Sequence, residues 1–163
     1  MKFNSKTITK IAVIAALYAT LTLLVYPIAF GSVQFRVSEA LTILPFFMPE
    51  AILGLFVGCI ISNLLSSNIV ILDVVFGSLA SLLAAYLTYR MPNKWLAPLP
   101  PVIVNAVIIG AVITFSMSAG DSFAAVFAMN SLSVGLGQLA VCYGLGIPLM
   151  IVLGKFKLNM TKA

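Results

Sequence analysis

The charged residues of this chain stand at the ends of long apolar stretches, and this spacing constrains the fold more than any other feature. The apolar stretches run over residues 8–30, 38–65, 72–89, 98–117 and 127–153. Hydrophobic residues make up 62% of the sequence, charged residues only 8%, and the mean hydropathy is +1.17, which lies far outside the range of a water-soluble domain. We therefore predict an integral membrane protein whose 163 residues form a single membrane domain over 1–163, with no soluble domain.

The stretch over 38–65 decides how many times the chain crosses the membrane, because Pro45 and Pro49 interrupt it. One kinked helix would give five spans and would place the two termini on opposite sides. A hairpin of two short helices turning near Met48 and Pro49 gives six spans and places both termini on the same side. The first stretch follows lysines, as a signal peptide does, but it is too long and has no small-residue cleavage site, so we interpret it as a retained helix.

The distribution of positive charge selects the hairpin. With six spans, one side of the membrane collects Lys2, Lys6, Lys10, Arg90, Lys94, Lys155, Lys157 and Lys162, and only Arg36 stays on the other side. The positive-inside rule makes the first side cytoplasmic, so the net charge of +5 reflects topology rather than nucleic-acid binding. The predicted fold is an all-α, compact six-transmembrane-helix bundle with cytoplasmic N and C termini. Its helices span roughly 8–30, 38–48, 49–65, 72–90, 97–117 and 127–153.

Polar residues gather toward the outer ends of these predicted helices. Glu39, Asn63, Asp73 and Asn130 fall near the outer ends, beside Arg36 in the first outer loop, while Asn105 and Gln138 lie deeper. Polar groups at membrane depth cost free energy unless they face a partner, a cavity or water. The sequence therefore predicts a shared outward-facing pocket.

Each of these residues also has a purely structural interpretation. Ser38 could cap the second helix, leaving Glu39 to favour the helix dipole or to pair with Arg36, and Asp73 could cap the fourth helix. The amides of Asn63, Asn105 and Gln138 could instead bond neighbouring helices. Asp121, in an exposed loop, is expected to be solvated. The sequence leaves the ligand and packing interpretations open.

The residue inventory excludes several function classes. The chain has no His, and its two cysteines, Cys59 and Cys142, stand alone in apolar runs, so we expect no metal site, no cofactor and no disulfide. Without a nucleophile and its base, we expect no enzyme activity. There is no phosphate-binding Gly-Lys-Ser/Thr loop, and the four acids map to helix ends or loops. The chain could bind a substrate but lacks its own energy source; a small oligomeric channel or exporter is the alternative function.

Small residues on the first helix form a separate pattern. Ala12 with Ala16, and Ala15 with Ala19, give two overlapping pairs at a spacing of four, which allows close helix approach. The pattern is typical either of a partner surface or of packing within the bundle.

Three runs carry a resemblance to a known family. They are Gln34-Phe-Arg-Val-Ser-Glu-Ala-Leu-Thr-Ile-Leu-Pro-Phe-Phe, Leu72-Asp-Val-Val-Phe-Gly-Ser-Leu-Ala and Leu96-Ala-Pro-Leu-Pro-Pro-Val. With these runs the chain resembles the QueT family over essentially its whole length. That family is similar to the substrate-binding S components of energy-coupling factor (ECF) transporters, which take up scarce vitamins and related compounds.

The resemblance implies partners and a location. An S component sits in the bacterial plasma membrane as a multi-pass protein, captures its substrate outside the cell, and works with a transmembrane coupling subunit (T component) and two cytoplasmic ATPases. In the wider class an Ala-x-x-x-Ala pattern on the first helix meets the coupling subunit. The resemblance thus assigns Ala12, Ala15, Ala16 and Ala19 to a partner interface.

The resemblance also implies a ligand, a queuosine precursor of the 7-deazaguanine type such as preQ1, preQ0 or queuine. Its ring N–H and exocyclic amine would suit the carboxylate of Glu39, and its carbonyl would accept from Gln138 or Asn105. A cationic aminomethyl group would suit Asp73. The flat base would stack on an aromatic side chain, for which Phe35, Phe76 and Tyr143 are the candidates.

Overall fold

The computed structural model describes residues 4–29, 35–66, 71–117 and 122–155, which are helical or lie in short turns. The elements are α1 (Ser5–Leu24), α2 (Tyr26–Ala29), the 3₁₀ helix η1 (Val37–Phe46), α3 (Glu50–Leu64), the π-helical segment η2 (Asp73–Gly77), α4 (Ser78–Arg90), α5 (Leu99–Ser116), α6 (Phe123–Val141), the π-helical segment η3 (Cys142–Gly146) and α7 (Ile147–Lys155). Asp121 and the C-terminal tail lie outside the described residues.

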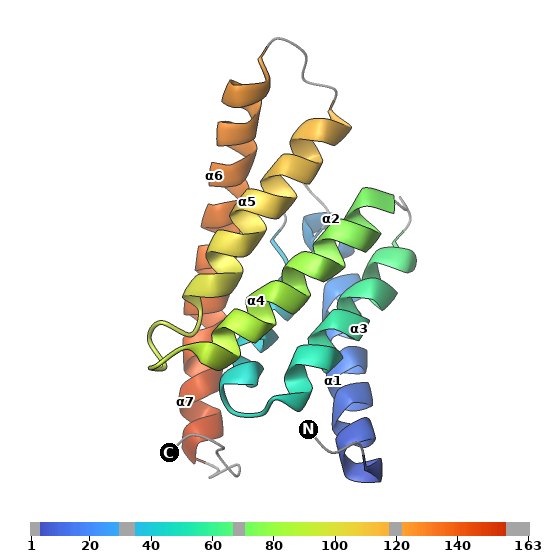
Figure 1. Cartoon of the computed structure of the whole chain (residues 1–163), viewed down its shortest axis with the longest axis vertical. Helices are drawn as coiled ribbons and strands as arrows, with labels where there is room; N and C mark the ends of the chain where they lie inside the picture. The colour runs from blue at the N-terminus through green and yellow to red at the C-terminus, as the bar shows by residue number, and fades with distance from the viewer. Residues whose placement is uncertain (1–3, 30–34, 67–70, 118–121, 156–163) are drawn as a thin grey trace.

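The chain runs up and down the long axis of the molecule, so that both termini lie at the same end (Figure 1). Three helices are long and apolar enough to cross a membrane, namely Ser5–Leu24, Leu99–Ser116 and the continuous run Phe123–Lys155. These helices confirm the prediction of an all-helical membrane protein. Two shorter apolar helices, Val37–Phe46 and Glu50–Leu64, occupy the region in which the sequence predicts a hairpin.

The first arm of that hairpin differs from the prediction, because η1 is a 3₁₀ helix rather than an α-helix. Pro45 lies inside it and has no N–H to donate to the preceding turn. Thr42 Oγ1 also donates to the carbonyl oxygen of Glu39 at 2.6 Å, which occupies a backbone acceptor. A 3₁₀ helix rises about 2.0 Å per residue against about 1.5 Å for an α-helix, so this short arm reaches further than an α-helix would.

Two other helix boundaries also differ from the sequence prediction. The first predicted helix, 8–30, is broken at Val25, where α1 ends and the four-residue α2 begins with Pro27 inside it. The last begins at Phe123 rather than at residue 127, and its α-helical pattern is interrupted by η3 just before Pro148. At both interruptions, near Pro27 and Pro148, a proline ring cannot fit against the carbonyl of the preceding turn in a regular α-helix, which accounts for the local change.

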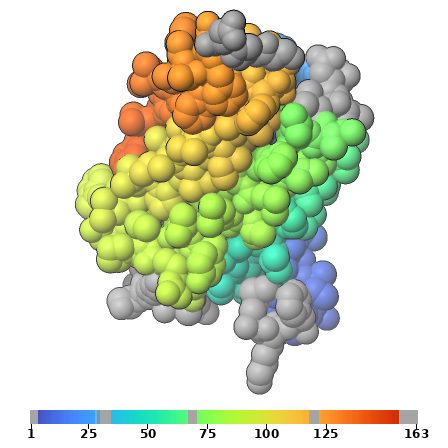
Figure 2. Space-filling view, turned by 45° about the horizontal axis from the view of Figure 1, so that its top comes forward, coloured from blue at the N-terminus to red at the C-terminus, as the bar shows by residue number. Residues whose placement is uncertain are grey.

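Glycines bring the helices into close contact at two places. In α3, Gly54 and Gly58 lie against α1, and a Cβ atom added at Gly58 would stand 2.8 Å from the carbonyl oxygen of Ala15. On the other side of the molecule, Gly110 of α5 lies against Ser131 of α6. Figure 2 shows α4, α5 and α6 together on one face of the molecule. Large apolar side chains project outward from these helices, including Leu83, Val107 and Leu136, as expected of a surface that contacts lipid.

The approach of α1 to α3 gives a stability prediction. Gly58→Ala should lower the free energy of unfolding by about 1–3 kcal/mol, because the new methyl group would overlap the backbone of Ala15. Gly154→Ala is the matched control, since a Cβ there meets nothing within 4 Å. Thermal unfolding of both purified variants in detergent measures the effect. Equal melting temperatures for the two variants would contradict this packing.

Candidate functional site

A buried carboxylate organises the interior of the bundle. Glu39 lies in the first turn of η1 and is only 1% exposed. Tyr18 Oη from α1 donates a hydrogen bond to its Oε1 atom. Asn105 Nδ2 from α5 donates to Oε2 at a longer distance of 3.4 Å. Side chains from two separate elements, α1 and α5, therefore converge on the two oxygen atoms of one carboxylate in η1.

Arg36 supplies positive charge beside this acid. Its side chain is 3% exposed and interacts electrostatically with both Glu39 and Asp73. Since a buried charge is costly unless it is compensated, an arginine near two acids lowers the cost of burying all three. Arg36 therefore links Glu39 to Asp73, the two acids that the sequence places beside it.

The capping role that the sequence offered for Ser38 is wrong. Arg36 occupies the N-cap position of η1 and makes no side-chain cap hydrogen bond. The hydroxyl of Ser38 instead shares a hydrogen bond of 2.6 Å with Thr22 Oγ1 of α1. Glu39 is also fully enclosed, which differs from the exposed first-turn carboxylate that a simple interaction with the helix dipole would require.

Gln138 borders the same cluster through Cys142. Gln138 is 3% exposed, and the Cys142 thiol donates to its Oε1 atom at 3.6 Å and to the Glu39 carbonyl oxygen at 3.7 Å. Cys142 is the first residue of η3, so the irregular part of the last helix packs against the first turns of η1. We call the set Tyr18, Arg36, Glu39, Asn105 and Gln138 the central cluster.

Asn63 and Asp73 form a neighbouring polar pair between α3 and η2. Asn63 Nδ2 donates to the Asp73 carbonyl oxygen at 2.9 Å. The Oδ1 atoms of both side chains are buried and find no hydrogen-bond partner among the described residues. Unsatisfied buried acceptors are costly, so these two oxygens are suited to receive donors from a bound molecule.

The remaining predicted site residues lie elsewhere. Asn130 Nδ2 donates to Thr114 Oγ1 at 3.0 Å and ties α6 to α5, and it lies well inside α6 rather than at its start. Tyr143 Oη donates to the Trp95 carbonyl oxygen at 3.2 Å. Phe76 is 46% exposed and lines a lateral apolar cavity of about 410 Å³ between η2 and α5. Phe35, half-buried ahead of Arg36, is the one aromatic candidate next to the central cluster in sequence.

The structure divides the four alanines of α1 into two faces. Ala15 and Ala19 are buried, and Ala15 packs on Gly58 of α3, so these two cannot form a partner surface. Ala12 and Ala16 are exposed on the other face. This corrects the sequence prediction for the pair Ala15 with Ala19, because α3 packs on the face of α1 that carries it.

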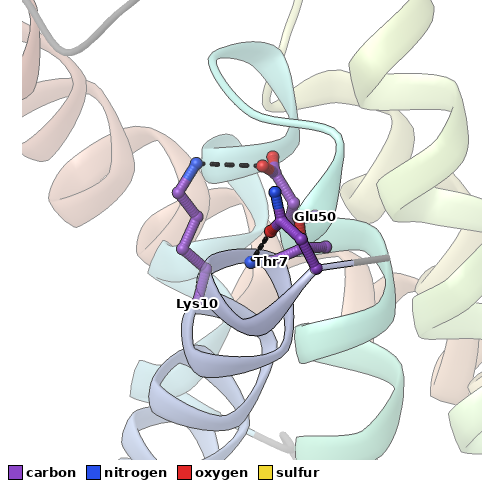
Figure 3. A network of polar contacts seen from close by, with 4 residues as sticks. Thr7, Lys10 and Glu50 are labelled. Carbon is purple, nitrogen blue, oxygen red and sulfur yellow. Dashed lines mark hydrogen bonds and ion pairs between the residues drawn. The ribbon is translucent and has the colours of Figure 1, made fainter. Parts of the chain in front are cut away.

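A polar contact at the end of the bundle that holds the termini fixes the start of α1. Lys10 Nζ and Glu50 Oε1 form an ion pair at 2.9 Å, joining α1 to the start of α3 (Figure 3). Asn4 Oδ1 also accepts from the Thr7 backbone N–H at 2.8 Å and caps α1. Within the described ranges, no group of three or more residues has side chains that could hold a metal ion.

Tyr18 and Thr22 were not predicted from the sequence as partners of the polar site. Both are fully buried and both bond the start of η1, Tyr18 through Glu39 and Thr22 through Ser38. A signal was present, since Ala15, Tyr18 and Thr22 recur at helical spacing on one face of the first helix.

Long apolar helices around an enclosed polar cluster define a multi-pass membrane protein. The chain belongs to the QueT transporter family, whose model, described as "QueT transporter", matches residues 8–155. One similar protein is the "Queuosine precursor transporter QueT" of Lactococcus lactis subsp. cremoris (strain MG1363), which is 45% identical over 83 residues. That match covers 48% of this chain and 48% of the relative, so the chain spans about half the length of the curated relative it matches. No solved structure matches the chain.

The enclosed position of Glu39 gives a second stability prediction. Tyr18→Phe should cost about 1–3 kcal/mol of folding free energy, because it removes a hydrogen bond to a buried carboxylate. Tyr143→Phe is the matched control and should cost less than about 1 kcal/mol, since its hydrogen bond is exposed. Denaturant titration of the purified variants compares them. A Tyr18→Phe protein as stable as the control would show that Tyr18 does not support Glu39.

Proposed function

We propose that this chain is the substrate-binding S component of an ECF-type importer, and that it captures a queuosine precursor of the 7-deazaguanine type outside the cell. Membership of a transporter family supports the transport role, and the name of the Lactococcus relative, a queuosine precursor transporter, supports the substrate. The observation that carries the proposal is the buried Glu39 carboxylate with its amide and hydroxyl donors. A buried carboxylate costs free energy in a purely apolar bundle, whereas in a binding site it can accept hydrogen bonds from the donor edge of a base.

The proposed membrane arrangement has six crossings of the bacterial plasma membrane and cytoplasmic termini. The antiparallel path, with both chain ends at one end of the molecule, supports it (Figure 1). Lys6 and Lys10 begin α1 at that end, Arg90 closes α4 there, and Lys155 closes α7. Positive charge gathered at one end of the bundle is the pattern that the positive-inside rule predicts for a cytoplasmic end.

In the proposed complex the ligand replaces internal partners of the cluster. The ring N–H and the exocyclic amine of a 7-deazaguanine would donate to the two oxygens of Glu39, which now accept from Tyr18 and Asn105. Once released, the Asn105 amide, or that of Gln138, can donate to the carbonyl of the base. Asp73, whose Oδ1 atom is buried without a partner among the described residues, would accept from a cationic aminomethyl group.

The proposed partners are a transmembrane coupling subunit and two cytoplasmic ATPases. The sequence has no phosphate-binding loop of its own, so ATP-driven uptake would have to be powered by other chains. Ala12 and Ala16 lie exposed on the face of α1 turned away from α3, where small side chains permit close approach of a partner helix.

The first functional prediction concerns Glu39. Glu39→Gln should weaken binding of the best 7-deazaguanine by roughly 30- to 1000-fold, because an amide places a donor against the donors of the ligand. Glu50→Gln is the matched control, since Glu50 pairs with Lys10 at the far end of the bundle. Isothermal calorimetry on both variants measures the affinities. Equal affinity for the wild type and Glu39→Gln would remove Glu39 from the site.

The second functional prediction concerns the partner surface. Ala16→Trp should reduce uptake at least about tenfold in cells that express the whole transporter, while the purified variant keeps its ligand affinity. Leu136→Trp, at an exposed position on α6, is the control and should leave uptake near normal. Parallel loss of uptake and binding in Ala16→Trp would assign Ala16 to internal packing.

A further inference from the structure

A second cavity lies at the end of the bundle that holds both termini. It has a volume of about 310 Å³ and is formed by the end of η1, the connection between α4 and α5, and α7. Its lining residues are Phe46, Phe47, Lys94, Met150, Ile151, Gly154 and Lys155. The apolar side of this groove continues onto the outer surface of α7, where Ile151 is 46% exposed and Val152 is 48% exposed. One side of the groove is therefore in contact with lipid chains in a membrane.

Two cations stand at the groove without an acid among its lining residues. Lys94 and Lys155 both line it and are exposed. Glu50, the acid at this end of the molecule, is paired with Lys10. The other described acids, Glu39 and Asp73, interact with Arg36. The groove thus combines an apolar wall with positive charge that an anion can neutralise.

The connection that carries Lys94 is held in place by the side chains of Asn93 and Tyr143. Asn93 Oδ1 accepts from the backbone N–H groups of Trp95 and Leu96, at 3.1 and 2.9 Å. Tyr143 Oη donates to the Trp95 carbonyl oxygen, and the Lys94 ammonium lies 5.5 Å from the centroid of the Trp95 ring. Trp95 is 57% exposed, and a tryptophan beside a lysine is typical of the boundary between hydrocarbon and headgroups. Tyr143, a candidate for stacking on a substrate, therefore serves to position this connection.

We infer that the groove is a binding site for an anionic phospholipid. The acyl chain lies along Met150, Ile151 and Gly154, and the phosphate lies by Lys94 and Lys155. Basic pockets between transmembrane helices bind anionic headgroups through this combination of apolar wall and paired cations. Gly154 has no side chain, and this leaves open space on α7 in which the acyl chain can lie. The inference needs only a membrane protein and is independent of the proposed substrate; the proposed orientation adds that the lipid comes from the cytoplasmic leaflet.

The single tryptophan of the chain, Trp95, is a built-in reporter for this site. The full chain is reconstituted with phosphatidylglycerol carrying brominated acyl chains, which quench tryptophan fluorescence on contact, diluted into ordinary phosphatidylcholine. The converse mixture carries the bromine on phosphatidylcholine. We expect phosphatidylglycerol to quench Trp95 with a relative binding constant roughly 5- to 30-fold above that of phosphatidylcholine. High salt should reduce this ratio, because the headgroup contact is electrostatic.

Three variants distinguish a specific lipid site in the groove from nonspecific attraction of the lipid to surface lysines. Lys94→Gln combined with Lys155→Gln should bring the ratio below about twofold. Gly154→Leu should do the same with both lysines present, since it fills the groove while its Cβ meets no neighbouring atom within 4 Å. Lys6→Gln, an exposed lysine at the same end that does not line the groove, should leave the ratio unchanged. Equal quenching by the two lipids in the wild type would overturn the inference. So would an undiminished ratio in Gly154→Leu, or an equal loss in Lys6→Gln.

Discussion

The burial of one carboxylate, that of Glu39, is the constraint on which the rest of the bundle depends. A charged group enclosed at membrane depth needs compensating charge and hydrogen bonds, and removing one partner costs more than the bond itself contributes. Here Tyr18 and Asn105 bond the two carboxylate oxygens, and Arg36 provides the positive charge. These residues come from α1, α5 and the N-cap of η1, so one acid holds α1, η1 and α5 together.

Two irregular parts of the backbone, η1 and η3, meet beside this acid, and a third, η2, carries Asp73. The Glu39 carbonyl oxygen in the 3₁₀ helix η1 accepts hydrogen bonds from the side chains of Thr42 and Cys142, and the Asp73 carbonyl oxygen in the π-helical segment η2 accepts one from Asn63. The second π-helical segment, η3, begins at Cys142 itself. Departures from α-helical geometry often mark functional sites, because they place backbone and side-chain polar groups where a regular helix would hide them. The position of η1 and η3 at the central cluster supports the proposal that this cluster is the ligand site.

The sequence predicts some features of this structure and misses others for a physical reason. Charges and prolines are visible in the sequence, so the membrane class, the short hairpin around Pro49 and the grouping of Glu39 with Arg36 could be predicted. The rotation of each helix about its own axis could not. In lipid both faces of a helix are apolar, so periodicity separates inside from outside only weakly, and the shared face of Ala15, Tyr18 and Thr22 on the first helix was overlooked. Tyr18 was therefore missed as a partner of Glu39, and Ala15 was assigned to an external surface although Gly58 covers it.

The central claim is that the enclosed polar cluster is a binding site for a 7-deazaguanine. The most direct test is a calorimetric titration of the purified wild-type chain, without partner subunits, with preQ1, preQ0, queuine and guanine. The proposal predicts saturable binding of at least one 7-deazaguanine with one site per chain, and much weaker binding of guanine, because guanine lacks the substituent that Asp73 would contact. A folded chain that binds none of the four compounds would contradict the claim, as would one that binds guanine as tightly as the others.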